Sequence, residues 1–456
     1  LVDIGDGQTI RQKDVFSNFI KSSYQLPESI DAKEQFKNTE EIINEALNSC
    51  LYPEPGPVHI NIPFAEPIYG TTDEIVSGKF SNNLDLPKLT DTSTINNIIE
   101  AFNTSKKVMI IVGQNRPDEE LNTLLCELSG NSNTVILTET TSNLYCEDFI
   151  DTIDNVVSAI PAEDAELFKP DILISFGGQV VSKMIKKFLR NNKPENHWHI
   201  SPSGESMDSY FSLTEAVIFN ITDFLSLLEI HSSSTTSMYS EIWKLKRESV
   251  DKRKKQFLSK VAYSDLKVFE TILNIIPSDS VLHLGNSTPV RYSQLFGSDP
   301  TIEYNSNRGV SGIDGQISTY VGYSFGSDNL NILITGDLGF LYDSNGLMNH
   351  YLKPNLKIIV INNQGGGIFR FIPGPDTTPN LEEFFEAKHQ WDSKYICKAF
   401  GVEYLKAENI VQVKDALPKF LKSENGPALL EIFTPSDKNG IILREYFKFI
   451  RVGKKD

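Results

Sequence analysis

The stretch that decides the fold is residues 331–369, NILITGDLGFLYDSNGLMNHYLKPNLKIIVINNQGGGIF. It contains two apolar runs, and each ends in polar and glycine residues, GDL after the first and NNQGGG after the second. The pattern predicts two parallel strands joined by a crossover helix over residues 340–352. A right-handed crossover brings both strand ends to one edge of a sheet. Asp337 and Asn363 are therefore expected to meet there.

These side chains have the chemistry of a magnesium site. The carboxylate of Asp337, the amide of Asn363 and the backbone carbonyl of Gly365 form the hard-oxygen set that Mg²⁺ prefers. The glycine turn lets backbone approach closely and supplies N–H donors for a diphosphate. The alternative is a plain strand-to-helix turn with Asp337 as helix cap, followed by an ordinary loop. The pairing of both clusters at this spacing favours the metal site.

Strand and helix patterns alternate along the rest of the chain in three blocks. Residues 1–75 close on PGPVHINIPFAEPIYG (55–70), in which VHINI predicts a buried strand and His59 a core position. Residues 76–235 carry short apolar runs without GxGxxG, which predicts a Rossmann-like domain that binds no dinucleotide. Residues 236–456 place their polar clusters at strand ends. We expect an α/β chain of three domains, each a parallel sheet flanked by helices.

Composition excludes several classes of protein. The chain has 43 Lys+Arg against 60 Asp+Glu, and its net charge of −17 repels nucleic acid and anionic membranes. The one dense basic run, KLKRESVDKRKK (244–255), mixes both signs and predicts a solvated helix face. No apolar run reaches the roughly 18 residues of a membrane span. The four cysteines form no CxxC, which argues against a zinc site or a disulfide framework. We expect a cytoplasmic protein.

The pairing of GDL with NNQGGG resembles the GDG…NN motif of thiamine diphosphate enzymes, which include acetolactate synthase, pyruvate decarboxylase and transketolase. This chain has Leu338 where the motif has its second glycine, and Asp337 keeps the ligand position. The resemblance implies that Asp337, Asn363 and the carbonyl of Gly365 hold Mg²⁺ or Mn²⁺ against the diphosphate. It also implies that Gly336 and Leu338 contact the cofactor.

Three further stretches narrow the resemblance, namely HINIPFAEPIYG (59–70), GNSTPVR (285–291) and IEYNSNRGVSGIDGQIST (302–319). They are similar, in the same order, to 2-succinyl-5-enolpyruvyl-6-hydroxy-3-cyclohexene-1-carboxylate (SEPHCHC) synthases of menaquinone biosynthesis, and the similarity runs along essentially the whole chain. NRGVSGIDG is the most specific part. The resemblance implies a transferase that decarboxylates 2-oxoglutarate on thiamine diphosphate and adds the succinyl-semialdehyde unit to isochorismate.

Such substrates carry several carboxylates, and the planar guanidinium of arginine binds a carboxylate through two hydrogen bonds. Arg291 and Arg308 each follow a predicted strand, and with Ser287 they match substrate-binding positions of the family. From the residues alone, Arg308 could instead form a structural ion pair. Lys183 matches a basic position that reaches the substrate, although Met184 follows where relatives can carry arginine. The alternative for Lys183 is a plain surface lysine.

Apolar residues of the family's site have counterparts here as well. Ile313 matches the bulky aliphatic side chain that keeps the cofactor bent. Ile368, Phe369 and Ile372 match residues that wall the site, and simple core packing is the alternative for these three.

The resemblance also assigns the three blocks. QTIRQKDVF (8–16) matches the middle of the family's pyrimidine-binding domain, with Gln8 at a position associated with the active site. Residues 1–75 would be the C-terminal part of that domain, residues 76–235 the central Rossmann-like domain and residues 236–456 the diphosphate-binding domain.

The glutamate that activates the cofactor in this superfamily is expected upstream of Leu1, so no catalytic residue is assigned and this chain alone is expected to be inactive. A homodimer or homotetramer is implied, because the superfamily builds its site between two subunits. Two other functions stay open at this point. One is a different thiamine diphosphate-dependent 2-oxoacid decarboxylase or an acetolactate synthase-like enzyme, and the other is a non-catalytic cofactor-binding fragment.

Overall fold

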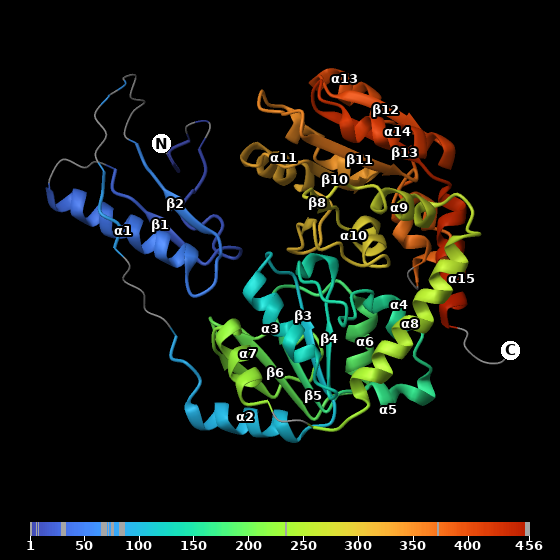
Figure 1. The fold of residues 1–456 in the computed structure, drawn as a ribbon. Helices are drawn as coiled ribbons and strands as arrows, with labels where there is room; N and C mark the ends of the chain where they lie inside the picture. Colours follow the sequence, from blue (N-terminus) through green and yellow to red (C-terminus); the bar gives the residue numbers. More distant parts are fainter. Residues whose placement is uncertain are drawn as a thin grey trace. The chain divides into compact units, whose positions relative to one another are not determined.

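A computed structural model of the protein describes residues 2–5, 7, 9–28, 33–64, 71, 73, 77–81, 87–232, 235–371 and 374–451. Its strands form three sheets, and helices lie between most successive strands (Figure 1), which confirms the predicted α/β class. The described residues group into two compact units. The first takes the chain up to Thr94 with Ile200–Ser206 and Ala216–Asn220, and the second takes the rest. The three sheets lie in the three expected residue ranges, whose boundaries stay a prediction.

The smallest sheet lies in the first unit. It pairs β1 (Ser22–Gln25) with β2 (Val58–Asn61) in parallel, and α1 (Lys33–Leu51) connects them. The strand predicted in VHINI is present, but its residues are only half-buried. The expected core position of His59 is therefore wrong, and its Nδ1 lies 3.4 Å from Ser23 Oγ at the edge of this small sheet.

The middle sheet has the strand order β4-β3-β5-β6-β7. Its strands are β3 (Val108–Val112), β4 (Thr134–Leu137), β5 (Ile172–Phe176), β6 (Asn196–Ser201) and β7 (Glu215–Ile218). Every residue of β3, β4 and β5 is buried, as in parallel strands that are covered on both faces. The accompanying helices are α2 (Thr92–Thr104), α3 (Glu119–Ser129), α4 (Ile153–Ser158), α5 (Ala165–Phe168), α6 (Lys183–Asn191) and α7 (Ile221–Ile230), with short 3₁₀ turns at η1 (Thr140–Ser142) and η2 (Ala162–Asp164).

The third sheet has the order β12-β13-β11-β10-β8-β9, so the two strands of the deciding stretch are neighbours. Its strands are β8 (Val281–Leu284), β9 (Glu303–Asn305), β10 (Asn331–Gly336), β11 (Leu356–Asn362), β12 (Glu403–Ala407) and β13 (Ala428–Phe433). β10 and β11 pair in parallel from Asn331↔Leu356 to Gly336↔Ile361, which confirms the expected strand pairing. Successive residues of β11 pack in two different core clusters, Ile359 in one and Ile358 and Val360 in the other, so both faces of the sheet are covered.

The helices around this sheet are α9 (Asp265–Leu273), α10 (Thr288–Ser293), α11 (Gln316–Gly326), α12 (Asp337–Tyr342), α13 (Lys394–Phe400), α14 (Ile410–Lys422) and α15 (Ser436–Arg451). Shorter turns occur at η3 (Ser344–Leu347), η4 (Gly367–Arg370), η5 (Pro375–Thr377) and the π-helical η6 (Leu381–Phe385).

The crossover between β10 and β11 differs from the single helix predicted over residues 340–352. α12 starts earlier, at Asp337, and stops at Tyr342, and η3 follows. Polar residues and a glycine in DSNG have low helix propensity and interrupt the helix. Asp343 instead accepts hydrogen bonds from the backbone N and the Oγ of Ser318, each at 2.7 Å, and so satisfies a free N–H in the first turn of α11.

The basic run lies on α8 (Tyr239–Leu258), which confirms the predicted helix. Its charges do more than face solvent, since Lys244 pairs with Asp148 at 2.8 Å and Arg247 donates from Nη1 to the carbonyls of Glu147 and Phe149, both at 2.6 Å. No helix among the described residues is long and apolar enough to cross a membrane.

Candidate active site

A cavity of about 310 Å³ lies in the second unit, where β8, β9, β10 and β11 end. Most residues predicted for the site line this one cavity, namely Ser287, Arg291, Arg308, Ile313, Gly336, Asp337, Leu338, Asn363, Gly365, Ile368 and Phe369. They come from segments that follow four neighbouring strands, β11, β10, β8 and β9, so the parallel sheet accounts for their convergence.

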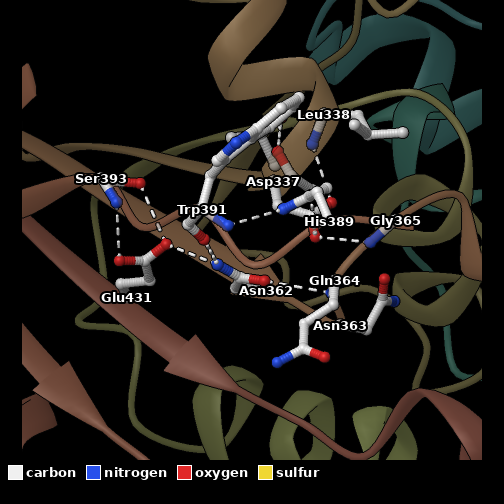
Figure 2. Close-up of polar contacts among 12 residues, drawn as sticks. Asp337, Leu338, Asn362, Asn363, Gln364, Gly365, His389, Trp391, Ser393 and Glu431 are labelled. Atoms are coloured by element: carbon white, nitrogen blue, oxygen red, sulfur yellow. Dashed lines mark hydrogen bonds and ion pairs between the residues drawn. The ribbon is translucent and has the colours of Figure 1, made fainter. Parts of the chain in front are cut away.

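Asp337 is fixed by backbone donors from both clusters of the deciding stretch (Figure 2). It follows β10 as the first residue of α12 and is 4% exposed. Its Oδ1 accepts from the backbone N of Leu338 at 2.7 Å, and its Oδ2 accepts from the backbone N of Gly365 at 2.9 Å. The two strand ends therefore meet through a hydrogen bond between Asp337 and Gly365, and Asn363, the expected partner of Asp337, lines the same cavity.

The two asparagines of NNQGGG have different environments. Asn362 shapes the turn, since its Oδ1 accepts from the backbone N of Gln364 at 3.0 Å and its Nδ2 donates to Glu431 Oε1 at 2.8 Å. Asn363 lines the cavity, and its Nδ2 donates to Asp265 Oδ2 at 3.1 Å. In the part of the chain that the structure describes, Asn363 Oδ1 is buried and has no hydrogen-bond partner. A buried acceptor without a donor is costly unless a cation or water meets it, so the donor set fits a divalent cation.

The glycine turn needs glycine for steric reasons. Gly365 has φ +145°, and a Cβ added there would lie 2.5 Å from the carbonyl oxygen of Glu386. That oxygen accepts from the backbone N of Gly366 at 2.6 Å. Arg370 holds Glu386 in place, donating from Nε to Oε1 at 2.7 Å and from Nη2 to Oε2 at 2.5 Å. The segment after η6 therefore packs closely on the turn.

Two arginines bring positive charge into the cavity. Arg308 is 7% exposed, and its Nη1 donates to Asn286 Oδ1, whereas its Nε has no hydrogen-bond partner among the described residues. Arg291 is half-buried and donates from Nη1 to the carbonyl of Val181 at 3.5 Å. Burial first, and then the charge of Arg291, lower the pKa of Arg308. No ion pair to a carboxylate within 4.0 Å is found for either arginine in the described ranges, so the structural ion pair considered for Arg308 is absent there.

Backbone strain gathers at the same site. Ser287, Ser311 and Gln364 adopt φ of +73°, +63° and +66°, a region that residues with a side chain seldom occupy. The first two line the cavity and the third lies in the glycine turn. Such strain is typical of functional sites, where the surrounding structure enforces it.

Comparisons with known proteins agree with this geometry. Residues 88–284 match the family described as "Middle domain of thiamine pyrophosphate", and residues 287–432 match "Thiamine pyrophosphate enzyme, C-terminal TPP binding domain". The chain is 40% identical to the SEPHCHC synthase of Flavobacterium johnsoniae, over 98% of this chain and 80% of the relative. It is 40% identical to that of Christiangramia forsetii, over 99% and 81%, and 37% identical to that of Porphyromonas gingivalis, over 98% and 79%.

The chain belongs to the SEPHCHC synthase family. Membership supports thiamine diphosphate as the cofactor and a thiamine diphosphate-dependent transferase as the class of enzyme. It does not favour the two alternatives, a different 2-oxoacid enzyme or a non-catalytic fragment.

One predicted site residue that the structure describes lies outside the cavity. Lys183 is the exposed first residue of α6 and does not line the cavity. Gln8 and Ile372 lie outside the described residues.

The N-terminus of α6 is nevertheless held next to the arginines of the cavity, since Arg291 donates to the carbonyl of Val181. Glu139 is 1% exposed, and its two carboxylate oxygens accept from the backbone N of Val181 and of Ser182, each at 2.7 Å. Burial raises the pKa of Glu139 to about 7, although these hydrogen bonds oppose the shift. Ser182 also donates to Asp154 and caps α6.

Sequence reasoning missed the residues behind the expected ligands. His389 Nε2 lies 3.1 Å from Asp337 Oδ2, although without regular hydrogen-bond geometry, and its ring stacks on Trp391 at 4.8 Å. The backbone N of Trp391 donates to His389 Nδ1 at 3.1 Å, which fixes the ring. Asp265 and Asn286 contact Asn363 and Arg308. His389, Trp391 and Asp265 lie in none of the motifs, so no local signal could have found them, whereas Asn286 belongs to the stretch GNSTPVR (285–291) but was not predicted as a site residue.

Proposed function

We propose that the protein is a SEPHCHC synthase that decarboxylates 2-oxoglutarate and joins the succinyl-semialdehyde unit to isochorismate in menaquinone biosynthesis. The observation that carries this proposal is the placement of Arg291 and Arg308 in the same cavity as Asp337 and Asn363. Two neighbouring guanidinium groups with no carboxylate within 4.0 Å among the described residues attract anions, and both substrates carry carboxylates.

For the metal, we propose Mg²⁺ or Mn²⁺ held by Asp337, Asn363 Oδ1 and the carbonyl of Gly365. Support comes from the buried Asn363 Oδ1, which has no hydrogen-bond partner among the described residues. It also comes from Asp337, which is 4% exposed and lines the same cavity. Both ions take oxygen ligands, and Mg²⁺ usually combines one or two carboxylates with phosphate oxygens and water.

For the cofactor, we propose that the cavity holds thiamine diphosphate against Gly336, Leu338, Ile313, Ile368 and Phe369. When bound, the cofactor supplies the electron sink that lets a 2-oxoacid lose CO₂. The four apolar side chains exclude water from this part of the cavity.

For the substrates, we propose that Arg291 and Arg308 bind carboxylates and that Ser287 donates a hydrogen bond beside them. Ser287 directly precedes α10, has a φ of +73° and lines the cavity. Lys183, Gln8 and the wall residue Ile372 stay predictions from the resemblance.

We further propose a homodimer or homotetramer in the cytoplasm. Large apolar side chains are exposed around the end of α11 and after η3, with Phe325 56%, Met348 76% and Tyr351 67% exposed. Exposed patches of this kind mark contact surfaces. The four cysteines are free thiols, as in proteins of reducing compartments. Sedimentation of the purified protein tests the oligomer, and a monomer at micromolar concentration would contradict it.

The activity is tested with protein expressed from its complete reading frame, incubated with 2-oxoglutarate, isochorismate, thiamine diphosphate and Mg²⁺. We expect CO₂ release coupled to formation of the cyclohexene product, both dependent on the cofactor. Release of CO₂ without that product would refute the specific function and leave a general 2-oxoacid decarboxylase.

A further inference from the structure

Asp265 is a buried carboxylate behind the loop that carries Asn363. It is the first residue of α9, is 1% exposed and does not line the cavity. Its sequence position, about a hundred residues before Asn363, gives no sign of the contact, and neither the family descriptions nor the motifs assign it a role.

The contacts of Asp265 have a definite direction. Its Oδ2 accepts from Asn363 Nδ2 at 3.1 Å, and its Oδ1 accepts from Thr434 Oγ1 at 2.6 Å. A carboxylate offers only acceptors, so it binds the amino end of the Asn363 amide and excludes the oxygen end.

The orientation of the amide follows from this pairing. With Nδ2 held by Asp265, the oxygen of Asn363 points away from the carboxylate, and within the described residues it meets no donor. We infer that Asp265 is a positioning residue that selects the amide orientation of Asn363 and so presents Oδ1 to the divalent cation. This inference rests on the proposed role of Asn363 as a metal ligand. Hydrogen-bond partners behind metal ligands commonly fix ligand orientation in this way.

Further residues hold Asp265 itself in place. Its backbone N donates to Asn439 Oδ1 at 2.9 Å, and Asn439 Nδ2 donates to Thr434 Oγ1 at 3.3 Å. These partners come from α15 and from the end of β13. Residues of two other elements therefore hold the Asp265 carboxylate independently of Asn363. The carboxylate can thus determine the orientation of the Asn363 amide rather than adjust to it.

The test measures Mn²⁺ affinity in the presence of thiamine diphosphate, from the paramagnetic resonance signal of free Mn²⁺, with protein from the complete reading frame. Asp265→Leu leaves the Asn363 amide free to turn, and we expect affinity to fall about 10- to 100-fold. Asp343→Leu is the matched control, because Asp343 is a carboxylate of the same sheet region, 6% exposed, that bonds Ser318 and no expected ligand. We expect its Mn²⁺ affinity to equal that of wild type.

A charge exchange separates orientation from folding. Asn363→Asp puts two carboxylates in contact, and adding Asp265→Asn restores one donor and one acceptor while an oxygen still faces the cation. We expect the double variant to bind Mn²⁺ at least about tenfold more tightly than Asn363→Asp alone. The inference would be overturned if the double variant and Asn363→Asp bound Mn²⁺ equally well, or if Asp265→Leu bound Mn²⁺ with wild-type affinity. If Asn363→Ala and Asp337→Ala also keep wild-type affinity, the metal site itself is wrong, and the two failures are thereby distinguished.

Discussion

Replacing Arg308 with methionine should reduce substrate binding while leaving the fold intact. The change removes a guanidinium that is 7% exposed, donates to Asn286 and has no carboxylate partner within 4.0 Å among the described residues. Losing the charge-assisted bond to Asn286 costs about 1.5–3 kcal/mol, and removing a buried charge next to Arg291 offsets part of that cost. We expect the free energy of unfolding to stay within about 1 kcal/mol of wild type. A charge-assisted bond to a substrate carboxylate contributes about 1.5–3 kcal/mol, so kcat/KM should fall about 10- to 150-fold.

Two assays test this prediction. Steady-state kinetics with varied 2-oxoglutarate and isochorismate give kcat/KM, and unfolding in urea gives the free energy of unfolding. Arg190→Met is the matched control, because Arg190 bonds the carbonyl of Ser209 from Nε and Nη2 and does not line the cavity. Its kinetics should match wild type. The reasoning would be refuted if Arg308→Met lowered the free energy of unfolding by about 3–5 kcal/mol and left kcat/KM unchanged. That is the result expected from breaking a buried structural ion pair.

Further predictions concern the glycine turn, pH and the cofactor. Gly365→Ala should lower the free energy of unfolding by about 1–3 kcal/mol, because Gly365 has a φ of +145° and an added Cβ would contact Glu386. The control, Gly322→Ala in the open interior of α11, should raise the free energy of unfolding by about 0.4–1 kcal/mol. An unchanged free energy of unfolding for Gly365→Ala in urea would contradict the close packing of the turn. The folded-state pKa of Glu139 is raised from 4.5 to about 7, so its stabilising contribution is full below pH 4.5 and is lost as pH rises through 7. In wild type the free energy of unfolding should therefore fall between pH 4.5 and pH 7, and Glu139→Gln should reduce that fall. If urea unfolding shows the same dependence on pH in both proteins, the raised pKa of Glu139 is contradicted. Asp337→Ala should abolish Mg²⁺-dependent binding of thiamine diphosphate in calorimetry, and an unchanged affinity would argue against the metal role.

Much of the fold and the centre of the site could be predicted because both depend on local patterns. Buried parallel strands appear as apolar runs, and β10 and β11 lie side by side with Asp337 and Gly365 in contact. The prediction of one continuous helix over residues 340–352 is wrong, because the residues DSNG (343–346) favour helix caps and turns over a continuous helix.

The residues that surround the expected ligands could not be predicted from one sequence. Asp265 and His389 reach the site only through packing of α9 and of the segment after η6, and nothing in their own neighbourhoods signals this. His59 was placed in a core because VHINI is apolar, but the two-stranded sheet leaves it half-buried. Sequence periodicity predicts which face of a strand is apolar, and it does not reveal how many layers cover that face.

The most direct test of the account is anomalous X-ray scattering from crystals of the protein grown with Mn²⁺ and thiamine diphosphate. We predict one strong peak within about 2.1–2.3 Å of a carboxylate oxygen of Asp337, of Asn363 Oδ1 and of the carbonyl oxygen of Gly365. A peak that lacks Asn363 or Gly365 as a ligand, or lies outside this cavity, would contradict the central claim that the ends of β10 and β11 form the metal–diphosphate site.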